Sequence, residues 1–219
     1  MALQLFFHPF SSYSQKALIA LRENGTAFTP RVLSPDDPAT GAEFAGRSPF
    51  GRFPILVDGE RTILEATTII EYLEAMHPGP VRLIPSDPLA AIDVRMMDRL
   101  FDNYVSTPQQ RVVYDALRAP AARDAQGVAE ARAMLETAYA WLDEHMARRE
   151  WAAADTFSLA DCAAAPALFY ADWTHPIDAR FENLTAYRQR LLARPSFARA
   201  VDAARPFRPY FPLGAPDKD

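Results

Sequence analysis

The sequence has few of the residues on which several common kinds of site depend. Lysine occurs only at Lys16 and Lys218 among the 23 basic residues, and no cluster of five or more basic residues exists. The sequence therefore indicates neither a nucleic-acid groove nor a polybasic membrane patch. Cysteine occurs once, at Cys162, which excludes an internal disulfide and fits a reducing compartment.

Long apolar segments are also absent. No run of roughly 18 or more apolar residues occurs, so we expect no membrane span. The start, MALQLFFHPF, lacks the basic residues and the long apolar stretch of a signal peptide. Apolar residues make up 49% and charged residues 23% of the chain, with a formal net charge of −5, which is typical of a globular protein. We therefore expect a cytoplasmic protein.

The spacing of glycine and histidine excludes further kinds of site. The chain has eight glycines, and no two of them are separated by a single residue, so a dinucleotide-binding fingerprint cannot be written. None of the eight is followed by lysine, so a phosphate-binding P-loop cannot be written either. The four histidines never stand four residues apart, and none lies within four residues of Cys162. We therefore expect no metal site.

The chain divides into two parts of different character. Residues 1–77 alternate between strand-like and helix-like segments, whereas 28 of the 39 alanines lie after residue 100, in a part that is helical throughout. Between the two parts, His77 to Pro88 contains four prolines in twelve residues, which cannot continue a helix. We predict a first domain over 1–77, a linker over 78–87 and an all-helical domain over 88–219.

The first part has the element order of a thioredoxin-like domain. Hydrophobic patterns predict strands and helices, and the turn signals are Gly25 as a left-handed helix end and Asp58-Gly59 as a hairpin. The expected strands are 3–7, 27–33, 53–57 and 62–64, and the expected helices are 15–22 and 66–76, with a loop and a short helix over 34–48. The order β-α-β-α-β-β-α corresponds to a four-stranded mixed sheet with helices on both sides.

The second part is predicted to be entirely helical. Its first helix has Asp87 as N-cap and Pro88 at the first position, runs to about Tyr104 and Val105, and is stopped by Pro108. Further helices are expected over 109–118, 124–148, 158–172, 182–193 and 196–204.

A helix-start signal at residues 157–162 predicts the environment of the single cysteine. Ser158 and Asp161 have the spacing of a capping box, and Phe157 and Cys162 occupy the two positions of a hydrophobic staple. We therefore predict that Cys162 is a buried packing residue and not a nucleophile.

The turn after the first strand is where a thioredoxin-like domain carries its reactive group. The Cys-x-x-Cys of redox proteins is replaced there by Ser11-Ser-Tyr-Ser14, so dithiol exchange is excluded. Hydroxyls and free N–H groups at a helix N-terminus favour an anion such as a ligand thiolate. Lowering a thiol pKa by about two units requires roughly 2.7 kcal/mol, which one charge-assisted hydrogen bond and the helix dipole could supply. Serine is also a common helix cap, and the spacing alone favours that simpler interpretation.

Two further positions suggest what such a ligand would be. If the Phe53-Pro54 bond is cis, the N–H and C=O of Phe53 turn outward and can pair with an extended peptide. Glu65 can accept from an ammonium group, and the N–H groups of Ala66 and Thr67 can face a carboxylate at a helix N-terminus. Together these groups describe a γ-glutamyl tripeptide thiol.

Four segments carry a resemblance to a known family. They are FSSYSQKALIAL from Phe10, PFGRFPIL from Pro49, LEATTIIEYL from Leu64 and FSLAD from Phe157. In order and spacing the chain resembles the cytosolic glutathione transferases, of a serine-type, bacterial-like kind with some similarity to zeta and tau members.

The resemblance implies the following site. Ser11, five residues before Lys16, would hold the glutathione thiolate, and Phe53, next to a cis bond to Pro54, would pair with the cysteinyl backbone. Glu65 and Ala66 would hold the γ-glutamyl group. The resemblance also implies a homodimer with the glutathione sites near the subunit interface.

Two departures from the family pattern matter. The usual Glu-Ser pair is Glu65-Ala66 here, so one side-chain hydroxyl is missing and we expect glutathione affinity to be weaker by about 1 kcal/mol. Tyr13 stands where the zeta-type isomerases have cysteine, which argues against a maleylacetoacetate isomerase. Ser12 and Ser14 are expected to bind glutathione and remain alternative catalytic hydroxyls. Pro54 is also expected to contact glutathione, and Arg52 is a candidate charge contact to it.

These residues predict a detoxifying transferase that adds the glutathione thiolate to a hydrophobic electrophile. The electrophile pocket is expected between the two parts, with Phe10 and Tyr104 in its wall. Two alternatives remain open: a glutathione-dependent isomerase or dehalogenase, and a non-catalytic binding protein of the same fold.

Overall fold

The computed structural model describes residues 2–219 and has a thioredoxin-like first part. Over residues 2–76 the elements are β1 (Leu3–Phe7), α1 (Ser12–Glu23), β2 (Phe28–Val32), α2 (Pro38–Arg47), β3 (Ile55–Asp58), β4 (Arg61–Leu64) and α3 (Ala66–Met76). The predicted order β-α-β-α-β-β-α is confirmed. The stretch predicted to be mainly loop contains the ten-residue helix α2, which begins at Asp37 as N-cap and Pro38 in the first turn.

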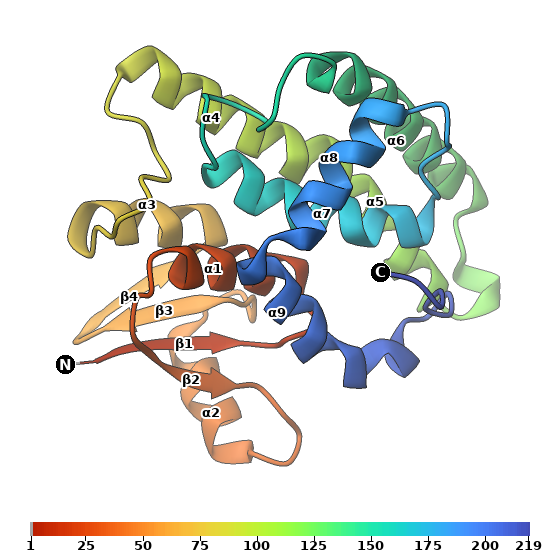
Figure 1. The fold of residues 1–219 in the computed structure, drawn as a ribbon. Helices are drawn as coiled ribbons and strands as arrows, with labels where there is room; N and C mark the ends of the chain where they lie inside the picture. Colours follow the sequence, from red (N-terminus) through yellow and green to blue (C-terminus); the bar gives the residue numbers. More distant parts are fainter. Residues whose placement is uncertain (1) are drawn as a thin grey trace.

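The sheet is mixed and is covered on both sides. Its strand order is β2-β1-β3-β4, with β1 and β2 parallel and the other pairs antiparallel. Helices α1 and α3 lie on one face and α2 lies on the other (Figure 1). Because side chains alternate along a strand, Leu5 packs toward α1 and α3 whereas Phe6 packs in the smaller cluster with Phe44 of α2.

The second part is all-helical over residues 88–219. Its elements are α4 (Pro88–Leu100), a π-helical segment η1 (Phe101–Ser106), α5 (Thr107–Ala116), η2 (Pro120–Ala122), α6 (Ala125–Met146), α7 (Leu159–Thr174), α8 (Glu182–Ala193), α9 (Pro195–Ala204) and η3 (Arg205–Tyr210). No helix or strand occurs between Met76 and Pro88, where the linker over 78–87 is predicted.

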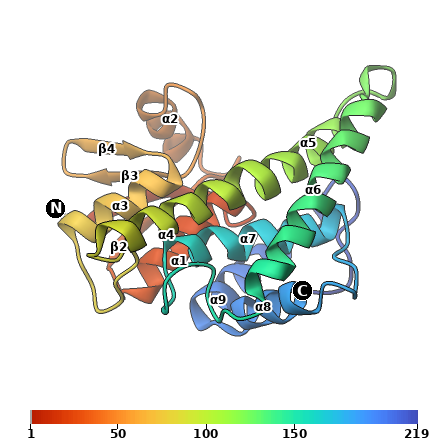
Figure 2. The ribbon, with the colours of Figure 1, turned by 90° about the horizontal axis from the view of Figure 1, so that it is seen from above.

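The prediction that Pro108 stops the first helix of this part is wrong. Leu100, Phe101, Ser106 and Thr107 all have right-handed helical backbone angles, and α4 continues through η1 into α5 (Figure 2). The N–H and the hydroxyl of Thr107 both donate to the C=O of Asp102, five residues back. This wider turn is the physical reason that the chain passes Pro108, in the first turn of α5, without leaving the helical path.

Helix α7 lies at the centre of the molecule and joins the two parts. Every residue of α7 is buried, and α1 packs against both α7 and α9. The predicted capping box is confirmed, because the N–H and the hydroxyl of Ser158 donate to Oδ2 of Asp161 over 2.9 and 3.1 Å. Cys162 is fully buried, as predicted, and burial raises the pKa of its thiol, so it serves packing.

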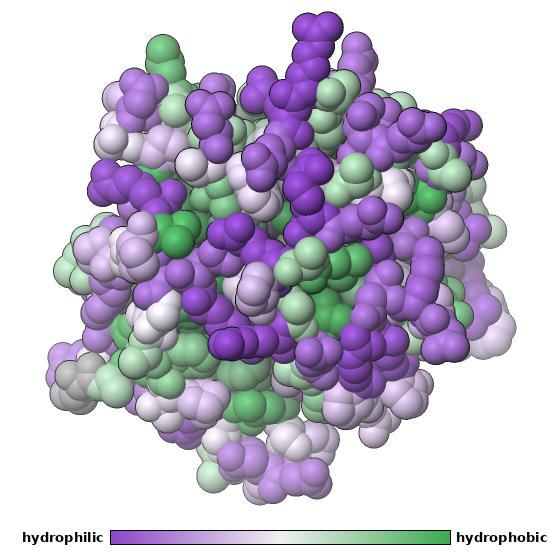
Figure 3. All heavy atoms as spheres, in the orientation of Figure 1, coloured by the Kyte–Doolittle hydropathy of each residue, from purple (hydrophilic) through white to green (hydrophobic). Residues whose placement is uncertain are grey.

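The molecular surface seen in the direction of Figure 1 is mostly hydrophilic. Its apolar side chains form small separate areas and not one broad patch (Figure 3). Over residues 2–219, no helix is both long and apolar enough to cross a membrane.

Candidate functional site

A cavity of about 630 Å³ lies between the two parts of the molecule. From the first part it is lined by His8, Ser48 and residues 10–13, 50–54 and 64–66. From the second part it is lined by residues of α4, η1, α5 and α7 and by Tyr210, Phe211 and Pro212. A cavity of this size holds a small peptide or a drug-sized molecule. The topology thus brings the ends of β1 and β4 and the starts of α1 and α3 to one place.

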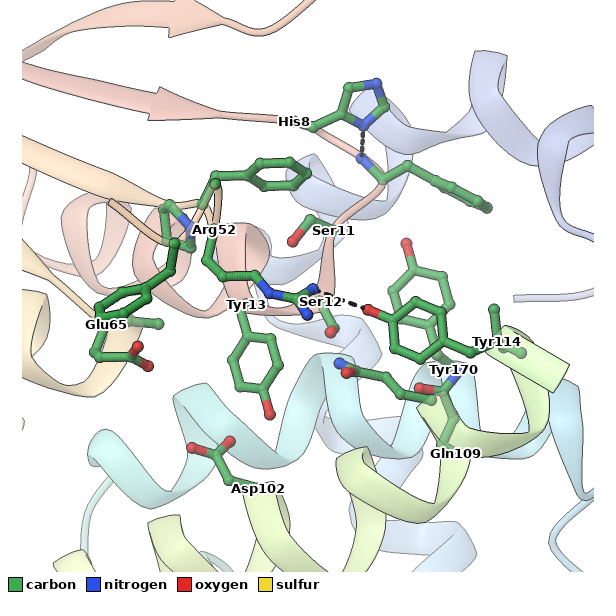
Figure 4. A pocket seen from close by; sticks show the side chains of 18 of the residues that line it. His8, Ser11, Ser12, Tyr13, Arg52, Glu65, Asp102, Gln109, Tyr114 and Tyr170 are labelled. Carbon is green, nitrogen blue, oxygen red and sulfur yellow. Dashed lines mark hydrogen bonds between the residues drawn. The ribbon is translucent and has the colours of Figure 1, made fainter. Parts of the chain in front are cut away.

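The N-terminus of α1 presents hydrogen-bond donors to the cavity, and Figure 4 shows the Ser11 and Ser12 side chains there. Ser11 is the N-cap, and its Oγ accepts from the N–H of Ser14 over 3.2 Å. Because this oxygen already accepts from the helix, its own hydrogen is free to donate to a ligand. Within residues 2–219, the N–H groups of Ser12 and Tyr13 have no hydrogen-bond acceptor. Three or more donors therefore converge where the helix dipole favours a negative charge.

The loop that holds Ser11 is fixed by His8, a residue that the sequence reasoning missed. The N–H of Ser11 donates to the C=O of His8 over 3.1 Å, and the N–H of Phe10 donates to Nδ1 of His8 over 3.2 Å. Burial lowers the pKa of His8, which keeps Nδ1 able to accept. His8 also stacks edge-on against Phe207 of η3 at 4.6 Å. No motif in the sequence indicated this role.

The loop before β3 leaves a peptide edge open. The Phe53-Pro54 bond is cis, as the resemblance implied. In the described part of the chain, neither the N–H nor the C=O of Phe53 takes part in a hydrogen bond. The hydroxyl of Ser48 donates to the C=O of Arg52 and accepts from its N–H, which fixes the loop beside Gly51, whose φ is +59°. The Arg52 guanidinium reaches the hydroxyl of Tyr114 over 3.4 Å.

The start of α3 forms a second donor cluster. Glu65 is the N-cap with φ 65° and ψ 126°, a conformation that a residue with a side chain adopts at a cost of roughly 1–3 kcal/mol. Its carboxylate is exposed and has no ion-pair or hydrogen-bond partner among residues 2–219. The N–H groups of Ala66 and Thr67 begin the helix without an intrahelical acceptor. An acceptor for an ammonium group thus stands beside donors for a carboxylate.

A buried ion cluster lies behind these two helix ends. The ammonium of Lys16 contacts Asp98 over 2.6 Å and Asp102 over 2.9 Å, and it donates to the hydroxyl of Thr67 over 2.9 Å. Lys16 is 1% exposed and does not line the cavity, so it is turned toward α4 and not toward a ligand. Arg99 also pairs with Asp102. The cluster fixes α1, α3 and α4 relative to one another.

The wall from the second part carries both polar and aromatic groups. Asp102 and Gln109 face the cavity from η1 and α5, and Tyr170 faces it from α7 (Figure 4). Phe10 packs edge-on against Tyr170 at 5.6 Å and against Phe211 at 6.4 Å. Burial, followed by the charge of Asp102, raises the pKa of Tyr13, so its phenol stays protonated.

The structure brings most of the predicted site residues together. Those that line the cavity are Phe10, Ser11, Ser12, Arg52, Phe53, Pro54, Glu65 and Ala66. Two do not. Ser14 is fully buried in the first turn of α1, and its hydroxyl accepts from the N–H of His8 over 3.4 Å. Tyr104 lies on η1 with 50% of its surface exposed and does not line the cavity, whereas Asp102 and Asn103 of the same turn do, because successive residues of a helix face different directions.

Among residues 2–219 no group of three or more His, Cys, Asp or Glu side chains is arranged to hold a metal ion. The donors of the site can bind an anion at each of two helix N-termini and can pair with an extended peptide between them.

Two segments of the chain match known protein families. Residues 5–81 match the glutathione S-transferase N-terminal domain, and residues 103–195 match the glutathione S-transferase C-terminal domain. The segments follow one another in the order of these domains and together cover most of the chain.

Three similar proteins match this chain over almost its whole length and over almost the whole of their own. Glutathione S-transferase 3 from Zea mays is 29% identical over 213 residues, which cover 92% of this chain and 94% of that protein. A stringent starvation protein A homolog from Haemophilus ducreyi is 24% identical over 209 residues, covering 93% and 92%. A solved structure, glutathione S-transferase from Methylobacterium radiotolerans in complex with glutathione sulfonate, has a TM-score of 0.79 at 30% identity, covering 92% of this chain and 95% of that chain.

Proposed function

The chain belongs to the glutathione transferase family, and from this premise we propose that it is an enzyme that adds the thiolate of glutathione to a hydrophobic electrophile. The observation that carries the proposal is the position of the free Ser11 hydroxyl at the N-terminus of α1, in one cavity with the start of α3. The cavity has room for glutathione beside a second molecule.

In this proposal the thiol of glutathione lies at the N-terminus of α1. The Ser11 hydroxyl donates to the sulfur, and the N–H groups of Ser12 and Tyr13 and the helix dipole add positive potential. A free thiol has a pKa of about 8.5, and a hydrogen bond to a charged group contributes about 1.5–3 kcal/mol, so the thiolate becomes the main form near neutral pH. Rate acceleration then comes from thiolate formation and from holding the two reactants together.

The rest of glutathione is held by main-chain groups. The N–H and C=O of Phe53 pair with the cysteinyl residue, as in the addition of a strand to a sheet edge. The γ-glutamyl carboxylate lies at the N–H groups of Ala66 and Thr67, and its ammonium lies at the carboxylate of Glu65. Arg52 adds a charge contact to the peptide.

We also propose that the protein is a cytoplasmic homodimer. Leu89, Ile92 and Met96 on α4 are 73%, 57% and 53% exposed and recur on one side of the helix, and Phe50 beside the cavity is 77% exposed. An apolar helix face of this kind suits a second copy related by a twofold axis. Sedimentation equilibrium tests this: a dimer that Phe50→Asp and Ile92→Asp dissociate supports it, and a monomeric wild type contradicts it.

The enzymatic proposal is tested by glutathione titration calorimetry and by conjugation of glutathione to chlorodinitrobenzene. We expect saturable binding in the micromolar to millimolar range and turnover above the rate of the uncatalysed reaction. Binding without turnover of any electrophile would instead favour a binding protein of the same fold, the second candidate, which Ala66 in place of the usual serine leaves open. No binding at millimolar glutathione would contradict both.

A further inference from the structure

A second hollow lies away from the cavity described above, at the other end of α1. It has a volume of about 350 Å³ and lies where the last turn of α1 meets the start of α9, which packs beside α1 (Figure 1). A helix rises by about 1.5 Å per residue, so Ser11 and Arg22 lie roughly 16 Å apart along α1. We call it the arginine hollow, and its lining residues are Arg22, Glu23, Arg194, Pro195, Ser196 and Arg199.

One of the three arginines in this hollow is neutralised by a carboxylate. The guanidinium of Arg194 donates two hydrogen bonds to Glu23, over 2.8 and 2.6 Å, and the hydroxyl of Ser196 donates to the same carboxylate. The Glu23 side chain is 8% exposed, and the guanidinium carbon of Arg194 lies 3.9 Å from the centre of the Phe157 ring. The pair is therefore a fixed wall of the hollow, in which one charge of each sign cancels.

The other two arginines have no carboxylate partner. Over residues 2–219, neither Arg22 nor Arg199 forms an ion pair. Nη1 of Arg22 donates to the C=O of Ser196 over 3.1 Å, which fixes the guanidinium at the hollow and leaves its other N–H groups for a ligand. Burial, followed by the charge of Arg199, lowers the pKa of Arg22, but an arginine in a protein keeps its charge near neutral pH. Two uncompensated positive charges therefore line one hollow.

Two unpaired guanidiniums in one hollow repel each other, and this repulsion lowers stability unless a ligand supplies negative charge. Elsewhere in the chain an arginine has such partners, since Arg205 pairs with Asp202 and with Asp219. Arg22 and Arg199 come from opposite ends of the chain, so the fold and not a basic run in the sequence brings them together. An anion bound between them explains the arrangement.

We propose that the arginine hollow binds a phosphate group, either as inorganic phosphate or as the end group of a small phosphate ester. Two guanidinium charges match the charge of about −2 that such a group carries at neutral pH. The planar fork of a guanidinium donates two parallel hydrogen bonds to phosphate oxygens. The volume of about 350 Å³ is at the lower end for small-molecule sites, and the formal net charge of −5 disfavours a long polyanion.

Titration calorimetry of the full-length protein with inorganic phosphate and with glucose 6-phosphate tests the proposal. We expect one site per chain and a Kd below about 1 mM for at least one probe, and the tighter probe identifies the source of the phosphate group. Arg199→Gln removes an exposed guanidinium and should weaken binding roughly 10- to 100-fold. The matched control is Arg132→Gln on the exposed side of α6, where the same loss of charge should leave Kd within about twofold.

A charge reversal separates ligand binding from a structural role. Arg199→Glu replaces the repulsion between Arg22 and Arg199 by an attraction, so the melting temperature of the ligand-free variant should equal or exceed that of the wild type. The tighter probe at about 10 mM should raise the melting temperature of the wild type by mass action and should leave that of Arg199→Glu unchanged.

Four outcomes would overturn the inference. The first is that neither probe binds at about 10 mM. The second is that Arg199→Gln binds as tightly as the wild type, and the third is that Arg132→Gln loses as much affinity, which would show an effect of net charge alone. The fourth is displacement of the bound phosphate by saturating S-hexylglutathione, which would place it in the cavity at Ser11. The proposed transferase activity is independent of all four.

Discussion

The ammonium nitrogen of Lys16 lies 2.6 Å from Oδ1 of Asp98, and both side chains are 1% exposed. One residue belongs to α1 of the thioredoxin-like part and the other to α4 of the helical part. Asp102 shares the same ammonium, and Thr67 of α3 accepts from it. The contact therefore holds the two donor-bearing helix ends of the site against the wall of the second part.

Replacing Lys16 with Met should destabilise the protein strongly. The change leaves Asp98 and Asp102 buried without their main counter-charge, and breaking one side of a buried ion pair costs about 3–5 kcal/mol. Urea unfolding followed by circular dichroism measures the change. The matched control is Arg95→Met, which removes an exposed 2.6 Å pair with Glu71 and should cost less than about 1 kcal/mol. Equal effects in the two variants would contradict the structural role of the cluster.

Replacing Ser11 with Ala should impair catalysis more than folding. Loss of a hydrogen bond to the thiolate, about 1.5–3 kcal/mol, predicts a decrease in kcat/KM of roughly 10- to 100-fold and a higher pH midpoint of the kcat/KM profile. The lost N-cap bond to Ser14 costs about 1 kcal/mol of stability. The comparison variant is Ser12→Ala, which should lose less activity and keep the wild-type midpoint. The reverse order of effects would assign the thiolate to Ser12.

Much of the fold could be predicted from local sequence signals. The strands of the sheet, the start of α3 at Ala66 and the capping box at Ser158 each depend on a short pattern, and the structure confirms them. The passage through Pro108 could not be predicted in this way. It depends on a wider turn in which Thr107 bonds five residues back to Asp102, and no residue type specifies that turn.

The residues of the site also fall into those that the sequence could predict and those that it could not. Ser11, Phe53 and Glu65 stand at the ends of elements, so the topology alone brings them together. Tyr104 was assigned to the pocket from its place near the end of a helix, but only its neighbours Asp102 and Asn103 line the cavity, and position along the chain does not tell which residue of a turn faces inward. Tyr170 lies in a helix that is buried on every side, so its sequence pattern does not distinguish a cavity-lining hydroxyl from core packing.

Replacing Ala66 with Ser should strengthen glutathione binding. The added hydroxyl would stand at the first helical position of α3, beside the N–H groups proposed to hold the γ-glutamyl carboxylate. One hydrogen bond of about 1 kcal/mol corresponds to a Kd roughly fivefold lower. Titration calorimetry with glutathione measures the change. Ala140→Ser makes the same substitution on the exposed side of α6 and should leave Kd as it is. An unaltered Kd in Ala66→Ser would show that the carboxylate lies elsewhere.

The hairpin between β3 and β4 should make stability depend on pH below neutrality. Oδ2 of Asp58 contacts Nε2 of His77 over 2.7 Å and accepts from the Tyr72 hydroxyl over 2.9 Å. These two hydrogen bonds, that of His77 first, lower the pKa of Asp58 below its ordinary value. Since the folded state then binds fewer protons than the unfolded chain, the stabilisation is complete above the unfolded pKa of about 4 and is lost as the pH falls through the lower folded value.

Replacing Asp58 with Asn should therefore flatten this part of the stability profile. Urea unfolding at a series of pH values between about 5 and 2 should show the free energy of unfolding falling more steeply in the wild type than in Asp58→Asn. Asp36→Asn removes an exposed carboxylate and should follow the wild-type slope, which separates Asp58 from the general titration of acidic groups. Parallel slopes in the wild type and Asp58→Asn would mean that His77 and Tyr72 do not stabilise the charged form of Asp58.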